Sequence, residues 1–408
     1  MAKGFQIKKL DWNLITVVIL LCTVGLVTIY SANTGMDEQN QVNNFHRQII
    51  WLAMGIIITV IMIMIPLKVF FAFAYVIYGG ALLGLIFVLL QDNGGASERW
   101  IRLGGMGLQP SEFAKIAVVL ALARYLSQCK IQNNKLKDFI IIFIMVAIPV
   151  YLIKEQPDLG TSLVFLSLII PLLYWAGTQP FTLFVLISPF LSVITSFEFI
   201  YFLCWMLIMV GVLYLSQKRL VVVMGLFLVN IAVGFITPEL WNNIEPYQQQ
   251  RIKILFDPHQ DARGTGYQVI QSMNAIGSGS ITGKGFLRGT QTQLRFLPEQ
   301  NTDFIFSVLG EEFGFVGIST VLLLFFLLIN RLVSIAVNAR NQFESSIVIG
   351  FASIILFHVF VNTGMTVNLM PVTGLPLPFL SYGGSFLITV MAMIGIVLNI
   401  DYKRGTYF

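Results

Sequence analysis

The sequence predicts an all-α membrane protein, and three observations lead to this fold class. Hydrophobic residues make up 56% of the 408 residues and charged residues only 11%, whereas soluble domains carry roughly 25% charged residues. Charge-free runs extend over residues 13–36, 69–91 and 159–197. About 20 apolar residues are enough for a helix to cross a membrane. Strands of an outer-membrane barrel would instead alternate apolar and polar residues over about 10 positions. The composition therefore excludes both a soluble enzyme and such a barrel.

Twelve membrane-spanning helices account for the apolar runs. We expect them at residues 13–31, 48–65, 69–90, 113–128, 139–153, 159–177, 180–196, 199–216, 220–237, 304–330, 346–365 and 379–400. The stretch 159–237 also allows fewer spans with one re-entrant segment, because Pro189 interrupts the seventh run and proline removes a helical hydrogen bond.

Basic residues predict how the spans are oriented, because short cytoplasmic loops are rich in Lys and Arg. If both termini are cytoplasmic, twelve spans place 14 of the 25 basic residues but only four of the 20 acidic residues on that side. The pair Lys218 and Arg219 then lies inside as well. Removing one span would invert everything that follows it, whereas removing two would leave the C-terminus inside.

Three segments on the opposite, extracytoplasmic side hold most of the remaining polar residues: 91–112, 154–161 and 238–302. The third has 65 residues, and loops of this length are usually functional or disordered. Its amphipathic part, 266–276, predicts short helices on the membrane surface. Its basic cluster is either a solvated surface or a site for an anionic head group such as a pyrophosphate. The cluster comprises Arg251, Lys253, Arg263, Lys284, Arg288 and Arg295.

The glycine-rich stretch GSGSITGKG at 277–285 predicts turns. It fails the phosphate-loop pattern GxxxxGK[ST], because Ser278 stands where the first glycine is needed and Gly285 stands where a hydroxyl residue is needed. An extracytoplasmic position would also separate it from ATP.

Acidic residues near the extracytoplasmic face are the candidates for chemistry. Asp303 lies at the start of the span at 304–330, where a carboxylate also favours the helix dipole. Glu311 and Glu312 follow about two turns later and should face protein or water, because charges in lipid are costly. Glu112 and Lys115 are three residues apart and share a helix face, which fits either a simple ion pair or part of a site.

Four stretches carry a family resemblance: ERWIRLGGMGLQPSEFAK at 98–115, QPDLGTS at 156–162, IGSGSITGKGFLRGTQTQLRFLPEQNTDFIFSVLGEEFGFVG at 276–317 and GLPLPFLSYGGS at 374–385. Together they resemble the SEDS family of bacterial cell-wall polymerases (shape, elongation, division and sporulation), which includes RodA and FtsW. The stretches occur in family order and span nearly the whole chain. GTQTQLRFLPEQ is more similar to RodA than to FtsW.

The resemblance implies a peptidoglycan glycosyltransferase for cell elongation and rod shape, acting at the outer face of the bacterial cytoplasmic membrane. The hydroxyl of an incoming lipid II attacks the anomeric carbon of a strand held on undecaprenyl pyrophosphate, which gives a β-1,4 bond with inversion. It also implies that Asp303 is the essential acid. Asp303 could act as the general base if partial desolvation raises its pKa.

The resemblance further implies that Trp100, Glu112 and Lys115 contact the substrate. Lys284, Arg288 and Arg295 of the basic cluster are further candidates for binding the substrate, and the structural or polar candidates are Asp158, Glu311, Glu312 and Ser381. A divalent cation, Mg²⁺ or Mn²⁺, is expected to help the leaving pyrophosphate, with no ligands assigned. No organic cofactor and no nucleic acid are expected. The implied partner is a class B penicillin-binding protein, which is a transpeptidase.

One departure from the family concerns the number of spans. RodA and FtsW typically have ten, so we expect a ten-span core in a single domain over 1–408, with a helical hairpin inserted within 180–237 and the large extracytoplasmic loop at 238–302. Three alternative functions remain: a lipid II flippase, an ion-coupled solute transporter and a non-catalytic scaffold for the transpeptidase. A flippase needs a polar path through the middle of the bilayer, whereas the acids and bases here concentrate near one face.

Overall fold

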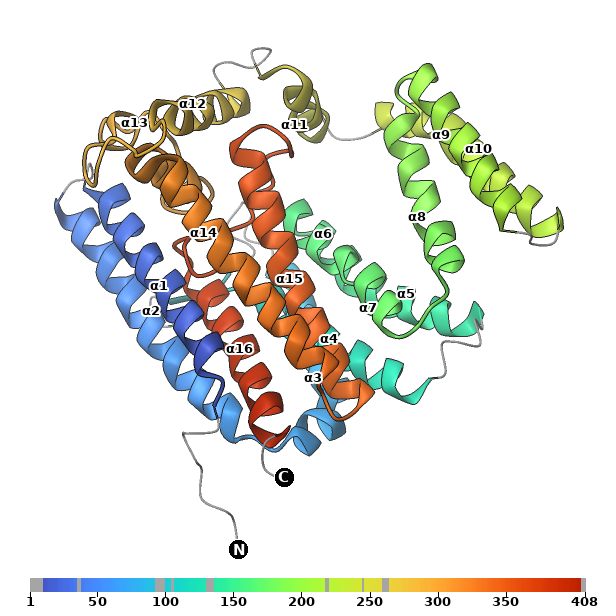
Figure 1. Ribbon diagram of the computed structural model, residues 1–408, viewed down its shortest axis with the longest axis horizontal. Coiled ribbons are helices and arrows are strands. Elements are labelled where there is room, and N and C mark those ends of the chain that lie inside the picture. Colours follow the sequence, from blue (N-terminus) through green and yellow to red (C-terminus); the bar gives the residue numbers. More distant parts are fainter. Residues whose placement is uncertain are drawn as a thin grey trace, which may run out of the picture.

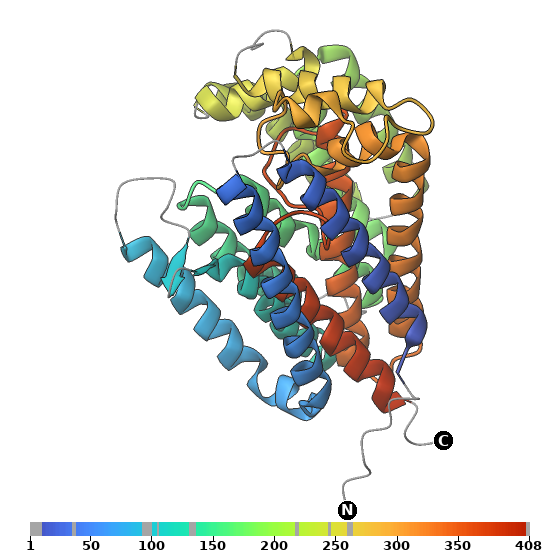
Figure 2. The same cartoon turned by 90° about the vertical axis from the view of Figure 1, so that its left-hand side faces the viewer.

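The computed structural model describes residues 10–34, 38–91, 100–103, 106–129, 136–216, 220–243, 246–258 and 264–404. They form a bundle of long helices. The first described helix starts, and the last one ends, at one end of the bundle, and three short helices lie across the other end (Figures 1 and 2). The predicted all-α architecture of a polytopic membrane protein is confirmed. Arg263 of the basic cluster and the pair Lys218 and Arg219 lie outside the described residues.

Each predicted span corresponds to a helix, or in one case to two consecutive helices. The bounds are α1 (Trp12–Asn33), α2 (Glu38–Met64), α3 (Leu67–Leu90), α4 (Pro110–Gln128), α5 (Leu136–Lys154), α6 (Leu159–Ser167), α7 (Ile169–Trp175), α8 (Pro180–Thr195), α9 (Phe199–Leu215), α10 (Leu220–Asn242), α14 (Ile305–Val337), α15 (Gln342–Thr366) and α16 (Gly384–Arg404). The helices across the end are α11 (Pro246–Phe256), α12 (Thr265–Ser278) and α13 (Thr290–Gln293). The amphipathic part of the long loop is therefore helical, as predicted.

Length and hydropathy support membrane spanning for most of these helices. Within the described residues, seven are long and apolar enough to cross a membrane: α1, α2, α3, α5, α14, α15 and α16. Four shorter apolar stretches, at 159–175, 180–195, 199–215 and 223–239, correspond to α6 with α7, α8, α9 and part of α10. Helix α4 carries three charged residues, Glu112, Lys115 and Arg124. The total of twelve spans stays a prediction.

Proline and glycine explain where helix boundaries differ from the predicted ones. The single span expected at 159–177 is divided into α6 and α7 at Leu168. Pro171 has no N–H group to donate to the carbonyl of Ser167, and the proline ring would clash with that carbonyl in a regular helix. Pro189, in contrast, lies inside a continuous α8. The last span was expected to start at residue 379, but α16 starts at Gly384 because residues 379–383 form turns.

Residues 280–285 of the glycine-rich stretch replace part of the hydrogen bonding of α14. Gly314 interrupts this helix with a φ of 63°, so the helical hydrogen bonds are lost there. The amides of Lys284 and Gly285 donate to the carbonyls of Glu311 and Glu312 at 3.0 Å each. In return, the amides of residues 315 and 316 donate to carbonyls 280 and 281 at 2.9 and 3.1 Å. The predicted turns thus complete a kinked helix.

A Cβ atom at Gly283 would lie 2.0 Å from the carbonyl oxygen of Glu312, and one at Gly314 would lie 2.3 Å from the amide nitrogen of Gly283. Real Cβ atoms essentially never come so close. Both positions also have positive φ, which glycine adopts without strain. The contact between the glycine-rich stretch and the kink of α14 therefore requires these two glycines.

A short β-hairpin in the loop before α4 is the one addition to the predicted all-helical fold among the described residues. Strand β1 (Ile101–Leu103) pairs antiparallel with β2 (Met106–Leu108), with Ile101 opposite Leu108. A hairpin of this size is only marginally stable alone. It is joined to the bundle because Ser385 of α16 donates to the carbonyl of Gly107 at 2.9 Å.

Helices α8, α9 and α10 form a unit beside the main bundle (Figure 1). Its own apolar cluster is buried around Trp205, Met206, Met209 and Leu213, apart from the main core. The unit covers the segment in which a hairpin insertion was predicted, and the insertion itself stays a prediction.

Candidate active site

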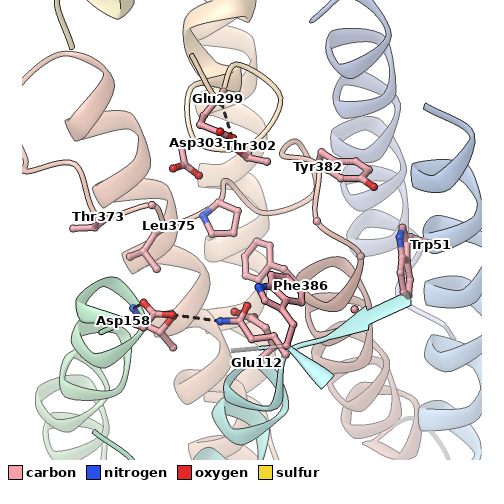
Figure 3. Close-up of a pocket in the computed structure, with 18 of the residues that line it drawn as sticks. Trp51, Glu112, Asp158, Glu299, Thr302, Asp303, Thr373, Leu375, Tyr382 and Phe386 are labelled. Carbon is pink, nitrogen blue, oxygen red and sulfur yellow. Dashed lines mark hydrogen bonds between the residues drawn. The ribbon is translucent and has the colours of Figure 1, made fainter. Parts of the chain in front are cut away.

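A cavity of about 1180 Å³ is lined by Arg251 of α11 together with residues of the bundle. It brings together four of the residues singled out in the sequence, Trp100, Glu112, Asp158 and Asp303, which come from three separate segments of the chain. Figure 3 places Asp303 on one side of the cavity and Glu112 with Asp158 on the opposite side. These four predicted residues thus face one shared space.

The backbone around Asp303 is fixed by three successive hydrogen bonds. The carbonyl of Asn301 accepts from the amide of Tyr382 at 2.9 Å, and the carbonyl of Thr302 accepts from the hydroxyl of Ser381 at 2.5 Å. The carbonyl of Asp303 itself accepts from the side-chain amide of Asn362 at 2.9 Å. Ser381, predicted only as a structural or polar candidate, therefore helps to hold the acidic loop in place.

Asp303 has the electrostatic character of a general base. Burial, and next the negative charge of Glu299, raise the pKa of its carboxyl from 3.8 to about 6. A hydrogen bond from Thr302 and the positive charge of Arg251 act in the opposite direction. The effect of desolvation on the pKa of Asp303 is thus larger than the opposing effects of Thr302 and Arg251. A raised pKa is what we expected of a base at this position.

Glu112 and Lys115 form a closely bonded pair at the start of α4. The ammonium nitrogen of Lys115 lies 2.9 Å from each carboxylate oxygen of Glu112. Pro110 at the first helical position starts the helix and puts the two residues on one face. Glu112 lines the cavity, whereas the ammonium of Lys115 is completely buried and is not among the lining groups. Lys115 therefore acts on the cavity through Glu112.

Asp158 combines a structural contact with a place on the cavity wall. It caps α6, with one carboxylate oxygen accepting from the amide of Thr161 at 3.0 Å. Its second oxygen accepts from the Thr161 hydroxyl at 3.0 Å and from the side chain of Gln109 at 3.3 Å. These bonds fix the carboxylate on the side of the cavity where Glu112 lies (Figure 3).

Trp100 lines the cavity while its ring packs on Gly107 of the β-hairpin. A Cβ atom at position 107 would lie 3.0 Å from this ring. Trp51 lines the cavity from α2, in contact with Gly384. These flat apolar faces suit the binding of sugar rings or of a lipid chain.

Glu311 and Lys284 lie outside the cavity and organise the loop before α14. Glu311 accepts from the Lys284 ammonium at 2.7 Å, from the amides of Gln291 and Thr292 at 2.9 and 3.0 Å, and from the Thr292 hydroxyl at 2.8 Å. Glu312 accepts a hydrogen bond from the hydroxyl of Ser31 on α1. Both glutamates are buried within protein, as predicted.

Of the three basic residues predicted to bind substrate, none is among the described residues that line the cavity. Lys284 is paired with Glu311, and the side chains of Arg288 and Arg295 are exposed elsewhere on the loop. The cavity instead receives Arg251 from the same basic cluster and Arg47 from α2.

Sequence reasoning did not single out several other lining residues, among them Arg47, Trp51, Glu299, Tyr382 and Phe386. Glu299 and Tyr382 lie inside the stretches that carry the resemblance, but neither has a spacing that marks it as functional. Arg47 stands in α2 beside His46, in a part of the chain without a quoted motif. Only the packing of α2 against α16 brings it to this wall.

The carboxylates of the cavity do not gather into a metal site. Among the described residues there is no group of three or more His, Cys, Asp or Glu side chains that could hold a metal ion. Asp158 is occupied by its cap and Glu112 by Lys115. Within the described part of the chain, the cavity carboxylates therefore do not form a site that fits a resident divalent cation.

Comparison with known proteins supplies the family. The model for cell cycle proteins of the FtsW, RodA and SpoVE type matches residues 11–205 and 201–406. The chain belongs to this family. Its relatives include the peptidoglycan glycosyltransferase MrdB of Escherichia coli, 38% identical over 97% of this chain and 94% of MrdB. The peptidoglycan glycosyltransferase RodA of Treponema pallidum is 33% identical, over 98% of this chain and 99% of that protein.

Two solved structures agree with the fold. One chain comes from a study of how a peptidoglycan synthase complex coordinates polymerization and crosslinking. It superposes with a TM-score of 0.71 at 30% identity, covering 97% of this chain and 99% of that chain. The rod shape determining protein RodA of Thermus thermophilus superposes with a TM-score of 0.64 at 26% identity, covering 97% of this chain and 98% of that protein. The likeness therefore extends along almost the whole of each chain.

Proposed function

We propose that this integral membrane protein is a peptidoglycan glycosyltransferase that polymerises lipid II into glycan strands for cell elongation. The observation that carries the proposal is a desolvated carboxylate, Asp303, with a pKa of about 6 in a large cavity. The full-length likeness to named peptidoglycan glycosyltransferases supports the same activity.

The site divides the reaction between two sides of the cavity. Asp303 accepts the proton of the acceptor hydroxyl as its oxygen attacks the anomeric carbon of the donor strand, so that the configuration inverts. The bond from that carbon to the diphosphate breaks, and undecaprenyl pyrophosphate leaves. Arg251 and Arg47 are the lining cations suited to the negative charge that develops on the diphosphate.

We further propose an orientation with both termini in the cytoplasm and the cavity on the extracytoplasmic side. The distribution of basic residues supports this orientation. Helix α1 starts at the same end of the bundle at which α16 ends, so this orientation places both of these helix ends on the cytoplasmic side (Figure 2). The partner is a class B penicillin-binding protein, and likeness to a chain from a peptidoglycan synthase complex supports assembly with a partner synthase component. We propose that a divalent cation, if it takes part, arrives bound to the diphosphate of the substrate. The roles given to Asp303, Arg251 and Arg47 do not require this cation.

Buried side chains give no support to the flippase alternative. Val119, Phe351 and Met393, near the middle of α4, α15 and α16, are buried apolar residues. A path for a charged head group would need polar residues there. Glu112, the charged residue of these helices on the cavity wall, lies in the first turn of α4 instead.

Purified full-length protein, with and without a class B penicillin-binding protein, tests the proposed function on lipid II. We expect glycan strands, resolved by gel electrophoresis, from the wild-type protein in the presence of its partner. The same protein in liposomes should not move fluorescent lipid II across the bilayer. Translocation without strand formation by folded protein would establish a flippase and refute the proposal.

The raised pKa of Asp303 gives the reaction a defined dependence on pH. The base works deprotonated, so kcat should be level above about pH 6 and should fall roughly tenfold per pH unit below it. Glu299 and Arg251 face the carboxyl of Asp303 with opposite charges.

A histidine in the cavity could give a similar dependence on pH, because imidazole side chains in general change charge between pH 5 and pH 8. His46 lines the cavity, so His46→Gln is the control. Initial rates between pH 5 and pH 8 should keep the acid limb in this variant, and an acid limb that disappears would transfer the role to His46.

A further inference from the structure

Two polar residues on α15 lie outside the cavity wall but contact groups on both sides of it. His358 and Asn362 are four residues apart, so they share one face of the helix, one turn from each other. Both side chains are completely buried. A polar group in such a position is costly unless it is hydrogen-bonded, and the bonds that each residue makes show what it serves.

Asn362 joins the acidic loop to the segment that connects α15 to α16. Its side-chain amide donates one hydrogen bond to the carbonyl of Asp303 at 2.9 Å and another to the carbonyl of Leu375 at 2.8 Å. Both N–H groups of the amide are therefore used. Three carbonyls of the acidic loop accept hydrogen bonds from Tyr382, Ser381 and Asn362. Of these three donors, Asn362 is the one that lies on a long helix.

His358 joins the same connecting segment to the other side of the cavity. One ring nitrogen, Nδ1, lies 3.0 Å from the carbonyl of Pro376, and the other, Nε2, lies 3.2 Å from the ammonium of Lys115. A carbonyl only accepts, so Nδ1 carries the proton. Lys115 then donates to the lone pair on Nε2 of a neutral ring. Lys115 in turn holds Glu112 on the cavity wall.

The two bridges end on adjacent residues. Leu375 and Pro376 both line the cavity. Figure 3 shows Leu375 between Asp303 on one side and Glu112 on the other. We infer that His358 and Asn362 are positioning residues that act as one unit, with α15 setting the distance between Asp303 and the pair of Glu112 and Lys115 through consecutive carbonyls of one segment. This inference rests on the proposed function, because the distance it fixes is the one that the acceptor and donor sugars occupy.

Kinetics of the purified full-length protein test the unit. In Asn362→Leu and in His358→Gln we expect kcat on lipid II to fall about 10- to 100-fold, since a misplacement of about 1 Å can cost 100-fold. KM should stay within about threefold, because neither residue touches the substrate. The kcat of the double variant should be no more than about threefold below that of the less active single variant. Losses that multiply in the double variant would refute a shared role.

Thr363→Val is the matched control. Thr363 lies on the same helix, and its hydroxyl donates to the carbonyl of Val359 in that helix at 2.7 Å. We expect kcat of this variant within about twofold of the wild type. If Asn362→Leu loses activity only in proportion to its loss of folded protein, measured by thermal unfolding, the residue is structural and the inference fails.

Nitrogen-15 NMR of histidine-labelled protein tests the bridge without using activity. The chain has three histidines, and His358→Gln assigns the signal of His358. At pH 7 this signal should be that of a neutral ring with its proton on Nδ1. A proton on Nε2 or a doubly protonated ring would overturn the bridge. Because this measurement needs no turnover, it separates failure of the inference from failure of the proposed glycosyltransferase activity, which the wild-type polymerisation assay reports.

Discussion

Replacing Asp303 with Asn should lower kcat for glycan polymerisation by about 100- to 10,000-fold, the range that general base catalysis contributes. The amide keeps the size of the side chain but cannot take the acceptor's proton. The carbonyl of residue 303 would still accept from Asn362, so the loop should keep its place. Single-turnover assays on lipid II measure the loss, and Asp303→Ala should show a loss of similar size.

The thermal stability of Asp303→Asn should not fall together with its activity. The native surroundings raise the pKa of Asp303 to about 6, so they disfavour its charged form at neutral pH. Removing that charge should leave the melting temperature unchanged or higher. Asp138→Asn, at the start of α5, is the control with the same chemical change away from the cavity, and its rate should equal that of the wild type. An Asp303→Asn protein that keeps a tenth of the activity would contradict the role of a base.

The second large effect concerns Lys115, the buried cation of α4. Lys115→Met should destabilise the protein by about 3–5 kcal/mol, because the carboxylate of Glu112 stays buried without its partner. Unfolding in detergent, followed by circular dichroism, measures the change. Lys154→Met is the control, since Lys154 is exposed at the end of α5, and it should cost less than about 0.5 kcal/mol.

A compensating variant separates the structural part of this effect from the functional part. Combining Lys115→Met with Glu112→Gln removes both charges, and replacing a buried ion pair with neutral groups is often nearly neutral for stability. The double variant should therefore regain most of the lost stability. Its polymerisation rate should stay low, because the cavity wall no longer presents the carboxylate of Glu112. Recovery of both properties would show that the pair serves the fold alone.

The sequence alone was sufficient for the features that depend on local chemistry. Apolar runs without charges can be placed only in a membrane, so the positions of the spanning helices followed from composition and periodicity. The spacing of Glu112 and Lys115 was enough to predict that they share a helix face and can form an ion pair, and the structure shows both features. The turns at 277–285 followed from glycine content, although their role in completing α14 did not.

Tertiary packing decided which polar groups share the cavity. Lys284, Arg288 and Arg295 were chosen for charge and position in the loop, but charge alone does not say whether a side chain is used by a neighbour. Lys284 forms an ion pair with Glu311 outside the cavity, whereas the side chain of Arg251 lines the cavity. Arg47 and Trp51 come from α2, and only its packing on α16 brings them to the site.

The sequence by itself determined the kind of protein and singled out Asp303 as the candidate base, because hydropathy and motif identity are properties of neighbouring residues. It could not determine how Asp303 gains the character of a base. That property depends on burial beside Glu299 and on carbonyls held by Asn362, Ser381 and Tyr382. Asn362, Ser381 and Tyr382 are about 60 to 80 residues away along the chain, and desolvation arises only when the folded helices exclude water from the space between them.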